Sequence, residues 1–94
     1  MLERRLTSVF FAKALRSWRN AHDTTQDEVA AKLGIAKSTV SDVETGRSGP
    51  WTRGRIRKLT KEFGLAALEA EALEDAAWED FCIWFEGKGE ADVG

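Results

Sequence analysis

Residues Gln26 to Thr45 read QDEVAAKLGIAKSTVSDVET, and the spacing of their apolar side chains predicts two short helices packed against each other. The first helix has residues three and four positions apart on one face, namely Val29, Ala30 and Leu33. The second has a matching face made of Val40 and Val43. The small side chain of Ala30 allows the second helix to approach closely. The stretch therefore predicts a helix-turn-helix.

The ends of the first helix are both marked in the sequence. Thr25-Gln-Asp-Glu28 has the spacing of a capping box, in which the threonine accepts a hydrogen bond from a first-turn amide and the glutamate reaches back. Gly34 can adopt the left-handed conformation that ends a helix, and Ile35 then turns into the angle between the two helices. We expect the first helix to start near Gln26 and the second to run from Lys37 or Ser38 to Glu44.

Five short motifs follow one another in order around this stretch. They are L-R-x-x-R from Leu15 to Arg19, T-Q-x-x-V-A from Thr25 to Ala30, L-G-I from Leu33 to Ile35, S-T-V-S from Ser38 to Ser41, and V-E-x-G-R from Val43 to Arg47. Over roughly residues 11 to 65, this pattern resembles the DNA-binding domain of the phage lambda repressor and Cro type, the XRE-like helix-turn-helix family. The resemblance implies an all-α, five-helix lambda-repressor-like domain that binds double-stranded DNA, usually as a dimer.

The resemblance also implies which residues contact DNA. The second motif helix would lie in the major groove and reach base edges through Lys37, Ser38, Ser41 and Asp42. A lysine donates to the O6 and N7 acceptors of guanine, so Lys37 predicts a guanine in each half-site; many family members have a glutamine there, and the adenine contact of a glutamine is not carried over. Phosphate contacts are expected from Gln26, Thr39, Thr45, Arg47, Arg53 and Arg55.

Two further roles come from the same resemblance. Gln26 is expected to brace Lys37, the first side chain of the second motif helix. Arg19 and Glu44 match positions that form a salt bridge between the first helix of the domain and the end of the second motif helix. We interpret this pair as structural, because breaking a buried pair strands the remaining charge.

Length and cysteine content set the general class of protein. A chain of 94 residues suits one domain whose core is large enough to fold without disulfides or metal. The single cysteine, Cys82, cannot form an intrachain disulfide and favours a reducing cytoplasm. The apolar cluster near the N-terminus is interrupted by Lys13 and Arg16, and no stretch approaches the ~18 apolar residues of a membrane helix. We expect a cytoplasmic, nucleoid-associated protein that does not bind membranes.

The formal net charge of -2 averages two parts of opposite sign. Residues 1–63 carry 13 Lys and Arg against 7 Asp and Glu, a balance of +6, whereas residues 64–94 carry one lysine against 9 acids, a balance of -8. This asymmetry predicts a basic functional surface on the first two-thirds of the chain and an acidic segment after it. The acids also fit a solvated helix face that keeps a basic module soluble.

The segments around the motif follow from apolar stripes and turn residues. A first helix is predicted to end before His22, with one stripe made of Phe11, Ala14, Leu15 and Trp18. Residues 1–10 are either an extension of that helix or an arm, with Arg4 and Arg5 contacting phosphate or simply exposed. Gly46 to Pro50 form a loop, and a fourth helix runs from a cap at Thr52 to Phe63, before Gly64. Trp51 is expected to pack on the core.

The last third of the chain is an acidic, aromatic-rich extension. We assign residues 1–64 to the DNA-binding domain (motif 26–45), residues 65–86 to a helical dimerisation segment of the same domain, and residues 87–94 to a frayed tail. One face is expected to hold Leu68, Ala72, Leu73 and Ala76. The stripe then moves, which predicts a bend or a separate element near residue 78 and leaves helix or strand open for residues 78–85. A homodimer contact is expected from Trp78, Phe81, Trp84 and Phe85.

Other classes of function have weaker support in the sequence. No P-loop, His-Glu-x-x-His motif, calcium loop or cysteine nucleophile with a base is present, so we predict no enzyme, no catalytic residue and no cofactor. His22 and Cys82 are too few for a zinc site, and no metal is expected. The leading hypothesis is a small phage- or bacterial-type repressor. The alternative is an antitoxin-type DNA-binding protein whose acidic C-terminal segment binds a protein partner.

Overall fold

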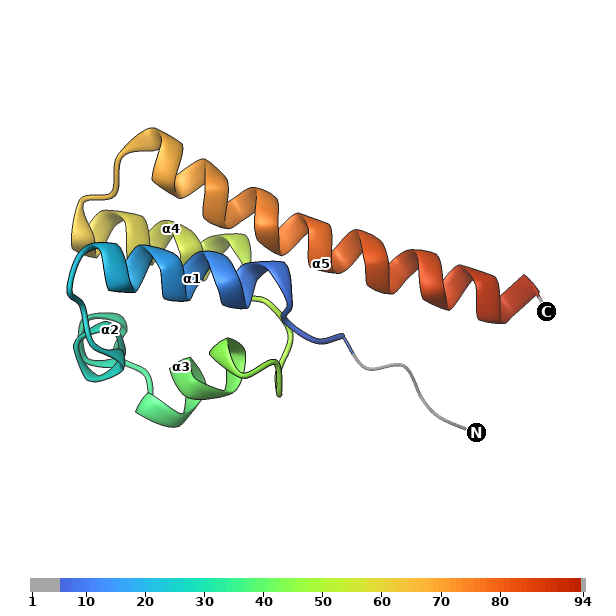
Figure 1. Ribbon diagram of the computed structural model, residues 1–94, viewed down its shortest axis with the longest axis horizontal. Coiled ribbons are helices and arrows are strands. Elements are labelled where there is room, and N and C mark those ends of the chain that lie inside the picture. The colour runs from blue at the N-terminus through green and yellow to red at the C-terminus, as the bar shows by residue number, and fades with distance from the viewer. Residues whose placement is uncertain (1–5, 94) are drawn as a thin grey trace.

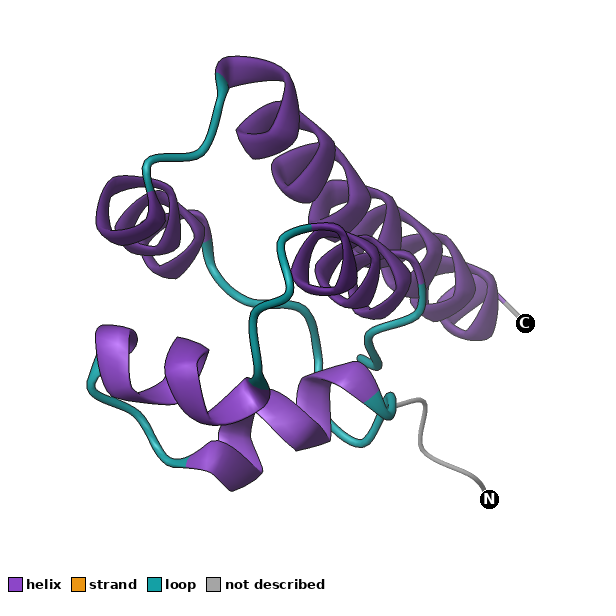
Figure 2. Cartoon of the chain, turned by 60° about the vertical axis from the view of Figure 1, so that its left-hand side comes forward, coloured by secondary structure: helices purple, strands orange, loops and turns teal. Residues whose placement is uncertain are grey.

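The computed structural model describes residues 6–93, and over this range the chain forms five α-helices and no strand. The helices are α1 (Phe10–Ala21), α2 (Gln26–Leu33), α3 (Lys37–Glu44), α4 (Arg53–Phe63) and α5 (Ala67–Val93). The all-α prediction is therefore confirmed. In Figure 1, α1 runs between α5 on one side and α3 on the other, with α4 behind α1. Figure 2 shows the same order from another direction, with α2 and α3 together below α1.

The core forms where the helices present the apolar faces expected from the sequence. The largest fully buried side chains come from every helix, and they are Phe11, Leu15, Val29, Val40, Val43, Ile56, Leu59 and Leu73. Trp51 is also buried, with its ring centroid 5.6 Å from that of Phe11, so its predicted core position is confirmed. Ala30 is buried and small, and Ile35 packs against the core from the turn between α2 and α3.

The predicted helix ends are confirmed by their geometry. Thr25 and Glu28 form the complete capping box at the start of α2. Gly34 follows α2 with φ +67° and Gly64 follows α4 with φ +61°, both in the left-handed region that favours glycine. At the start of α4 the hydroxyl of Thr52 accepts from the amide of Arg55 at 3.3 Å. Local sequence signals therefore determine the limits of α2 and α4.

The last third of the chain differs from the prediction in its continuity, in where its helix ends and in which face is buried. α5 is one continuous helix through Trp78, with neither the bend nor the strand that the moving stripe allowed. It also continues to Val93, where a frayed tail was expected from Gly87. Glycine inside a helix costs only ~1 kcal/mol relative to alanine, so Gly87 and Gly89 weaken the helix without ending it. Neither α5 nor any other helix in the described range is long and apolar enough to cross a membrane.

The buried face of α5 also differs from the predicted one. Leu73 is buried and Ala76 packs against the core as predicted, but Leu68 is 80% exposed and Ala72 is exposed. The buried positions are Leu73, Ala77 and Asp80. These residues are four and three apart, which is regular helical spacing, but one of the three is a carboxylate. A search for apolar stripes passes over such a position. The side chain of Asp80 accepts hydrogen bonds from the amides of Val9, Phe10 and Phe11 at the start of α1, each at 3.0 Å.

Residues before α1 include a short segment without helical structure. From residue 6 to residue 9 the chain is irregular, and the amide of Ser8 donates to the carbonyl of Ser48 at 2.9 Å. The segment therefore resembles the predicted arm more than an extension of α1. The expectations for Arg4 and Arg5 lie outside the described residues.

Candidate nucleic-acid interface

The outer face of α3 carries half of the side chains that the sequence assigned to DNA. Lys37, Ser38, Ser41, Asp42 and Thr45 follow helical spacing along one side, and all are exposed or half-buried. The opposite side is anchored by Val40 and Val43, which are fully buried in the core. α3 therefore lies on the surface with a polar face outward, and it starts after Ala36, whose side chain does not cap it.

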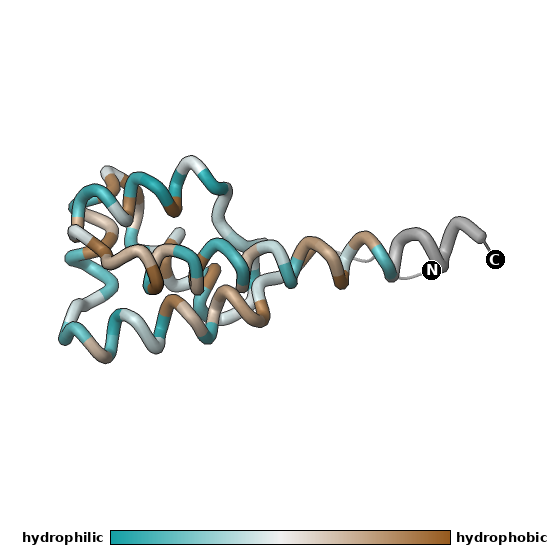
Figure 3. The backbone as a smooth tube through the Cα atoms, turned by 90° about the horizontal axis from the view of Figure 1, so that it is seen from above, coloured by the Kyte–Doolittle hydropathy of each residue, from teal (hydrophilic) through white to brown (hydrophobic). Residues whose placement is uncertain are grey.

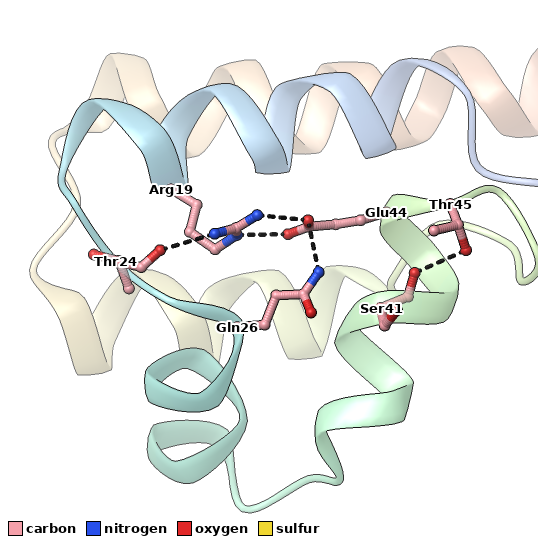
Figure 4. A network of polar contacts seen from close by, with 6 residues as sticks. All are labelled: Arg19, Thr24, Gln26, Ser41, Glu44 and Thr45. Carbon is pink, nitrogen blue, oxygen red and sulfur yellow. Dashed lines mark hydrogen bonds and ion pairs between the residues drawn. The ribbon is translucent and has the colours of Figure 1, made fainter.

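A buried carboxylate at the end of α3 ties three helices together (Figure 4). Glu44 is 4% exposed and accepts two hydrogen bonds from the guanidinium of Arg19 on α1, both at 2.8 Å. It also accepts from the side-chain amide of Gln26 on α2 at 3.1 Å. A further nitrogen of Arg19 donates to the carbonyl of Thr24 at 3.1 Å. The structure thus brings Arg19 and Glu44 together in the pair that the sequence indicated.

The contact with Glu44 stabilises the charged form of Arg19. The hydrogen bond to Glu44 raises the pKa of Arg19 above its ordinary value; burial opposes this shift and the attraction of the carboxylate adds to it. The guanidinium therefore stays charged at every pH at which the protein is folded. A bidentate contact between a planar guanidinium and a carboxylate also fixes the relative orientation of the two side chains. The network consequently sets the angle of α3 relative to α1 and α2.

Gln26 and Lys37 have different partners from the ones expected. The side-chain amide of Gln26 donates to Glu44 instead of bracing Lys37, because the buried carboxylate is the stronger acceptor within its reach. Lys37 forms an ion pair with Asp27 at the start of α2, with 3.5 Å between Nζ and Oδ2. Both of these side chains are largely exposed, so the pair is weak and easily exchanged for another acceptor.

Three residues assigned to phosphate lie on α3 or directly after it, and they are Thr39, Thr45 and Arg47. Thr39 and Arg47 are at the start of α3 and in the loop that follows it, and Arg47 is exposed. The hydroxyl of Thr45 donates to the carbonyl of Ser41 at 2.9 Å, so its hydrogen is already used within α3. Thr45 must give up this bond before it can donate to a phosphate.

The two arginines in the first turn of α4 point in different directions. Arg53 forms an ion pair with Glu74 of α5, with 3.3 Å between Nε and Oε1. Arg55, two positions further along, lies with its guanidinium 5.7 Å from the ring centroid of Trp51. Side chains two positions apart on a helix diverge by about 200°, so Arg55 is directed away from the side that faces α5. Arg53 therefore faces α5, while Arg55 is directed elsewhere.

The aromatic residues of α5 form a second surface. Trp78 and Phe85 are 66% and 60% exposed, and Phe81 is half-buried. A groove of about 740 Å³ lies between α4 and α5, and its apolar lining includes Trp51, Ile56, Ala77, Trp78, Phe81 and Phe85. Trp84 is half-buried and its ring contacts that of Phe85, with 5.1 Å between centroids. We call Trp78, Phe81 and Phe85 the aromatic edge of α5.

Two structural contacts between helices were missed from the sequence. Lys58 on α4 donates to the carbonyl of Leu33 at 3.0 Å and so satisfies the end of α2. Asp80 acts as the cap of α1 from a distant helix. One signal pointed to it: α1 begins after Val9, which has no capping side chain, and its first turn contains no acidic residue.

Comparison with known proteins gives the family. The family model described as Helix-turn-helix matches residues 15–69, which include α2, α3 and α4. The chain is 39% identical over 59 residues to an uncharacterized HTH-type transcriptional regulator of Archaeoglobus fulgidus, a match that covers 63% of this chain and 24% of that protein. It is 31% identical over 61 residues to another uncharacterized HTH-type transcriptional regulator, from Methanocaldococcus jannaschii, over 65% of this chain and 91% of the relative. No solved structure matches the chain significantly.

The chain therefore belongs to the helix-turn-helix family, as the sequence predicted. The family and the names of both relatives support a DNA-binding regulator of transcription. The chain matches about a quarter of the Archaeoglobus protein, so what that whole protein does is not transferred.

Proposed function

We propose that this helix-turn-helix protein is a sequence-specific regulator of transcription that inserts α3 into the major groove of duplex DNA. The observation that carries the proposal is the fixed polar face of α3. Its inner side is fully buried through Val40 and Val43, and its end is held by the hydrogen bonds of Glu44. A helix held in this way presents its side chains to base edges with little loss of conformational freedom.

Base readout is assigned to Lys37, Ser38, Ser41 and Asp42 on this face. Lys37 exchanges its exposed ion pair with Asp27 for the acceptors of a guanine, at small cost because both partners are already solvated. Asp42 can accept from the amino group of a cytosine. Phosphate contacts are assigned to Gln26, Thr39, Arg47 and Arg55, and to Thr45 and Arg53 once each exchanges its present partner.

We propose further that the regulator binds DNA as a homodimer through the aromatic edge of α5. One recognition helix covers only a few base pairs, so a two-fold dimer on two half-sites extends the sequence that is read. α5 lies on the opposite side of α1 from α3, so a contact there leaves both α3 helices open to DNA (Figure 1). The edge and the groove beside it occur on every copy, which suits the self-complementary contact of a two-fold dimer.

The charge of this region argues against DNA as its occupant, and the exposed aromatic rings are what favour a second copy. Residues 64–94 carry 9 acids against one lysine, so phosphate is repelled. Trp78 and Phe85 are of the residue types that dominate interface cores.

A bound dimer acts most simply as a repressor, because it blocks a promoter by occupying it. A foreign protein on the same edge, as in the antitoxin alternative, is the competing outcome of the test below.

The proposal is tested by selecting bound duplexes from random DNA and measuring the mass of the complex. We expect a motif with two inverted half-sites about one helical turn apart, bound by two copies of the chain. Selected DNA without any common motif would overturn sequence-specific binding. A single half-site bound by one copy would overturn the dimer and leave α5 to a foreign partner.

Cys82 provides a second check of where the two copies meet. It is half-buried on α5, next to Phe81 and four positions after Trp78. A short thiol-specific cross-linker is expected to join two copies through this cysteine, and Cys82→Ser is the matched control. A dimer that the cross-linker does not capture would place the contact elsewhere.

A further inference from the structure

Asp80 caps α1 from a helix that is distant in the sequence. One carboxylate oxygen accepts from the amides of Val9 and Phe10 and the other accepts from the amide of Phe11, all at 3.0 Å. Asp80 is only 3% exposed. Its negative charge lies at the positive end of the α1 dipole and satisfies amides that have no partner inside the helix.

α1 is consequently tied by polar contacts at both ends. At its last turn, Arg19 holds Glu44 of α3, and at its first turn the amides hold Asp80 of α5. Hydrogen bonds depend on direction as well as distance, whereas apolar packing tolerates sliding. The contacts at the two ends of α1 therefore fix the orientation of α5 relative to α3.

The position of Asp80 along α5 determines what its contact with α1 can control. Among the side chains described, Asp80 is the last buried one on α5, and beyond it Ile83 and Phe85 are half or more exposed. α5 has 27 residues and so spans about 40 Å. Figure 1 shows the C-terminal part of α5 extending past the other helices, and Figure 3 shows the same extension from above. A change in the angle of α5 at Asp80 therefore changes the orientation of the aromatic edge, which lies on both sides of this position, relative to α1.

We propose that Asp80 is a positioning residue that fixes the direction of α5 relative to α3, and thereby the half-site spacing that a dimer reads. The inference rests on the α5 homodimer proposed above. In such a dimer the separation of the two α3 helices is the sum of fixed steps from α3 to α1, from α1 to α5, and across the two-fold contact. Asp80 supplies the second of these steps.

The test uses duplexes that carry two identical half-sites whose separation changes one base pair at a time, together with a duplex that carries one half-site. Binding is compared for the full chain, Asp80→Ala, Asp80→Asn and the control Glu79→Gln, an exposed acid on the same helix. We expect the wild type and the control to prefer one spacing. The Asp80 variants are expected to lose that preference while keeping the affinity for one half-site, and their amides at Val9 to Phe11 are expected to exchange hydrogen faster.

The outcomes separate this inference from the proposal beneath it. If Asp80→Ala does not fold by circular dichroism, Asp80→Asn, which keeps one acceptor oxygen and the side-chain volume, carries the test. A folded, dimeric Asp80 variant that keeps the wild-type spacing preference overturns the inference alone. A folded variant that becomes monomeric also overturns it, because Asp80 would then act in the contact itself. A monomeric wild type overturns the dimer and, with it, this inference.

Discussion

The outer face of α3 and the aromatic edge of α5 lie on opposite sides of α1 and differ in how they are held. α3 is eight residues long, and its end is fixed by a buried carboxylate with partners on two other helices. α5 is 27 residues long, and its aromatic edge is largely uncovered in a single chain. The contrast is the basis of the proposal that one copy supplies the complete surface of α3, whereas the aromatic edge of α5 is covered by a second copy.

The largest effect is expected from breaking the network at α3. Glu44→Ala leaves the charge of Arg19 and the amide of Gln26 without their acceptor, and we expect it to lower the free energy of unfolding by about 2 to 3 kcal/mol. The partial exposure of Arg19 keeps the loss below that of a fully buried pair. Urea denaturation measures the change. Glu79→Ala, which removes an exposed acid from α5, is expected to change stability by less than about 0.5 kcal/mol. Equal losses in the two variants would contradict the contrast.

The aromatic edge of α5 is expected to show the opposite behaviour. Trp78→Ala combined with Phe85→Ala removes two exposed rings, so the fold should persist while dimerisation weakens by about 2 kcal/mol or more, roughly 30-fold. Analytical ultracentrifugation measures the dimer and circular dichroism the fold. Leu68→Ala is the control, because Leu68 is also an exposed apolar residue but lies near the other end of α5. A folded double variant that stays dimeric would contradict the assignment.

These two regions also show what the sequence could and could not predict. The limits of α2 and α4 depend on contacts within a few residues, such as the Thr25 and Glu28 capping box and the cap at Thr52, so a local pattern is sufficient. The pair of Arg19 and Glu44 was identified by a family resemblance, because nothing local links positions 25 residues apart.

α5 shows why the rest was not predictable. Its buried face includes Asp80, whose burial depends on three amides of a helix about 70 residues away. A pattern search takes such an acid for a solvated residue and therefore leaves Asp80 off the buried face that it shares with Leu73. The hydrogen bond from Gln26 to Glu44 could not be predicted for a similar reason, because these residues come within reach of each other only when α2 and α3 have packed.

The two arginines of α4 offer a smaller test of which side of the molecule faces DNA. Arg55→Gln is expected to reduce the slope of log affinity against log salt by about one per half-site, because one phosphate contact is lost. Arg53→Gln is the matched control in the same turn, and its pairing with Glu74 predicts a smaller change. Equal reductions in slope would mean that Arg53 leaves Glu74 to reach phosphate.

The smallest effect concerns Glu69 near the start of α5. Its hydrogen bond with His22, and secondarily one from the amide of Ala66, lowers the pKa of this carboxyl below its ordinary value. A lowered pKa in the folded state adds stability above the pKa of the unfolded chain, and that stability is lost as the pH falls through the lowered value. Glu69→Gln should therefore make thermal stability slightly less dependent on pH below about 5. Glu71→Gln, an exposed neighbour, is the control, and an identical flattening there would contradict the assignment.

The most direct test of the central claim, that the outer face of α3 reads bases, is a change of specificity at Lys37. Duplexes selected by the wild type are compared with those selected by Lys37→Gln under the same salt. Lysine pairs with guanine acceptors and glutamine pairs with adenine, so we predict that one position in each half-site changes from guanine to adenine while the rest of the motif is kept. An unchanged motif would contradict the account, because Lys37 would then lie outside the base contacts.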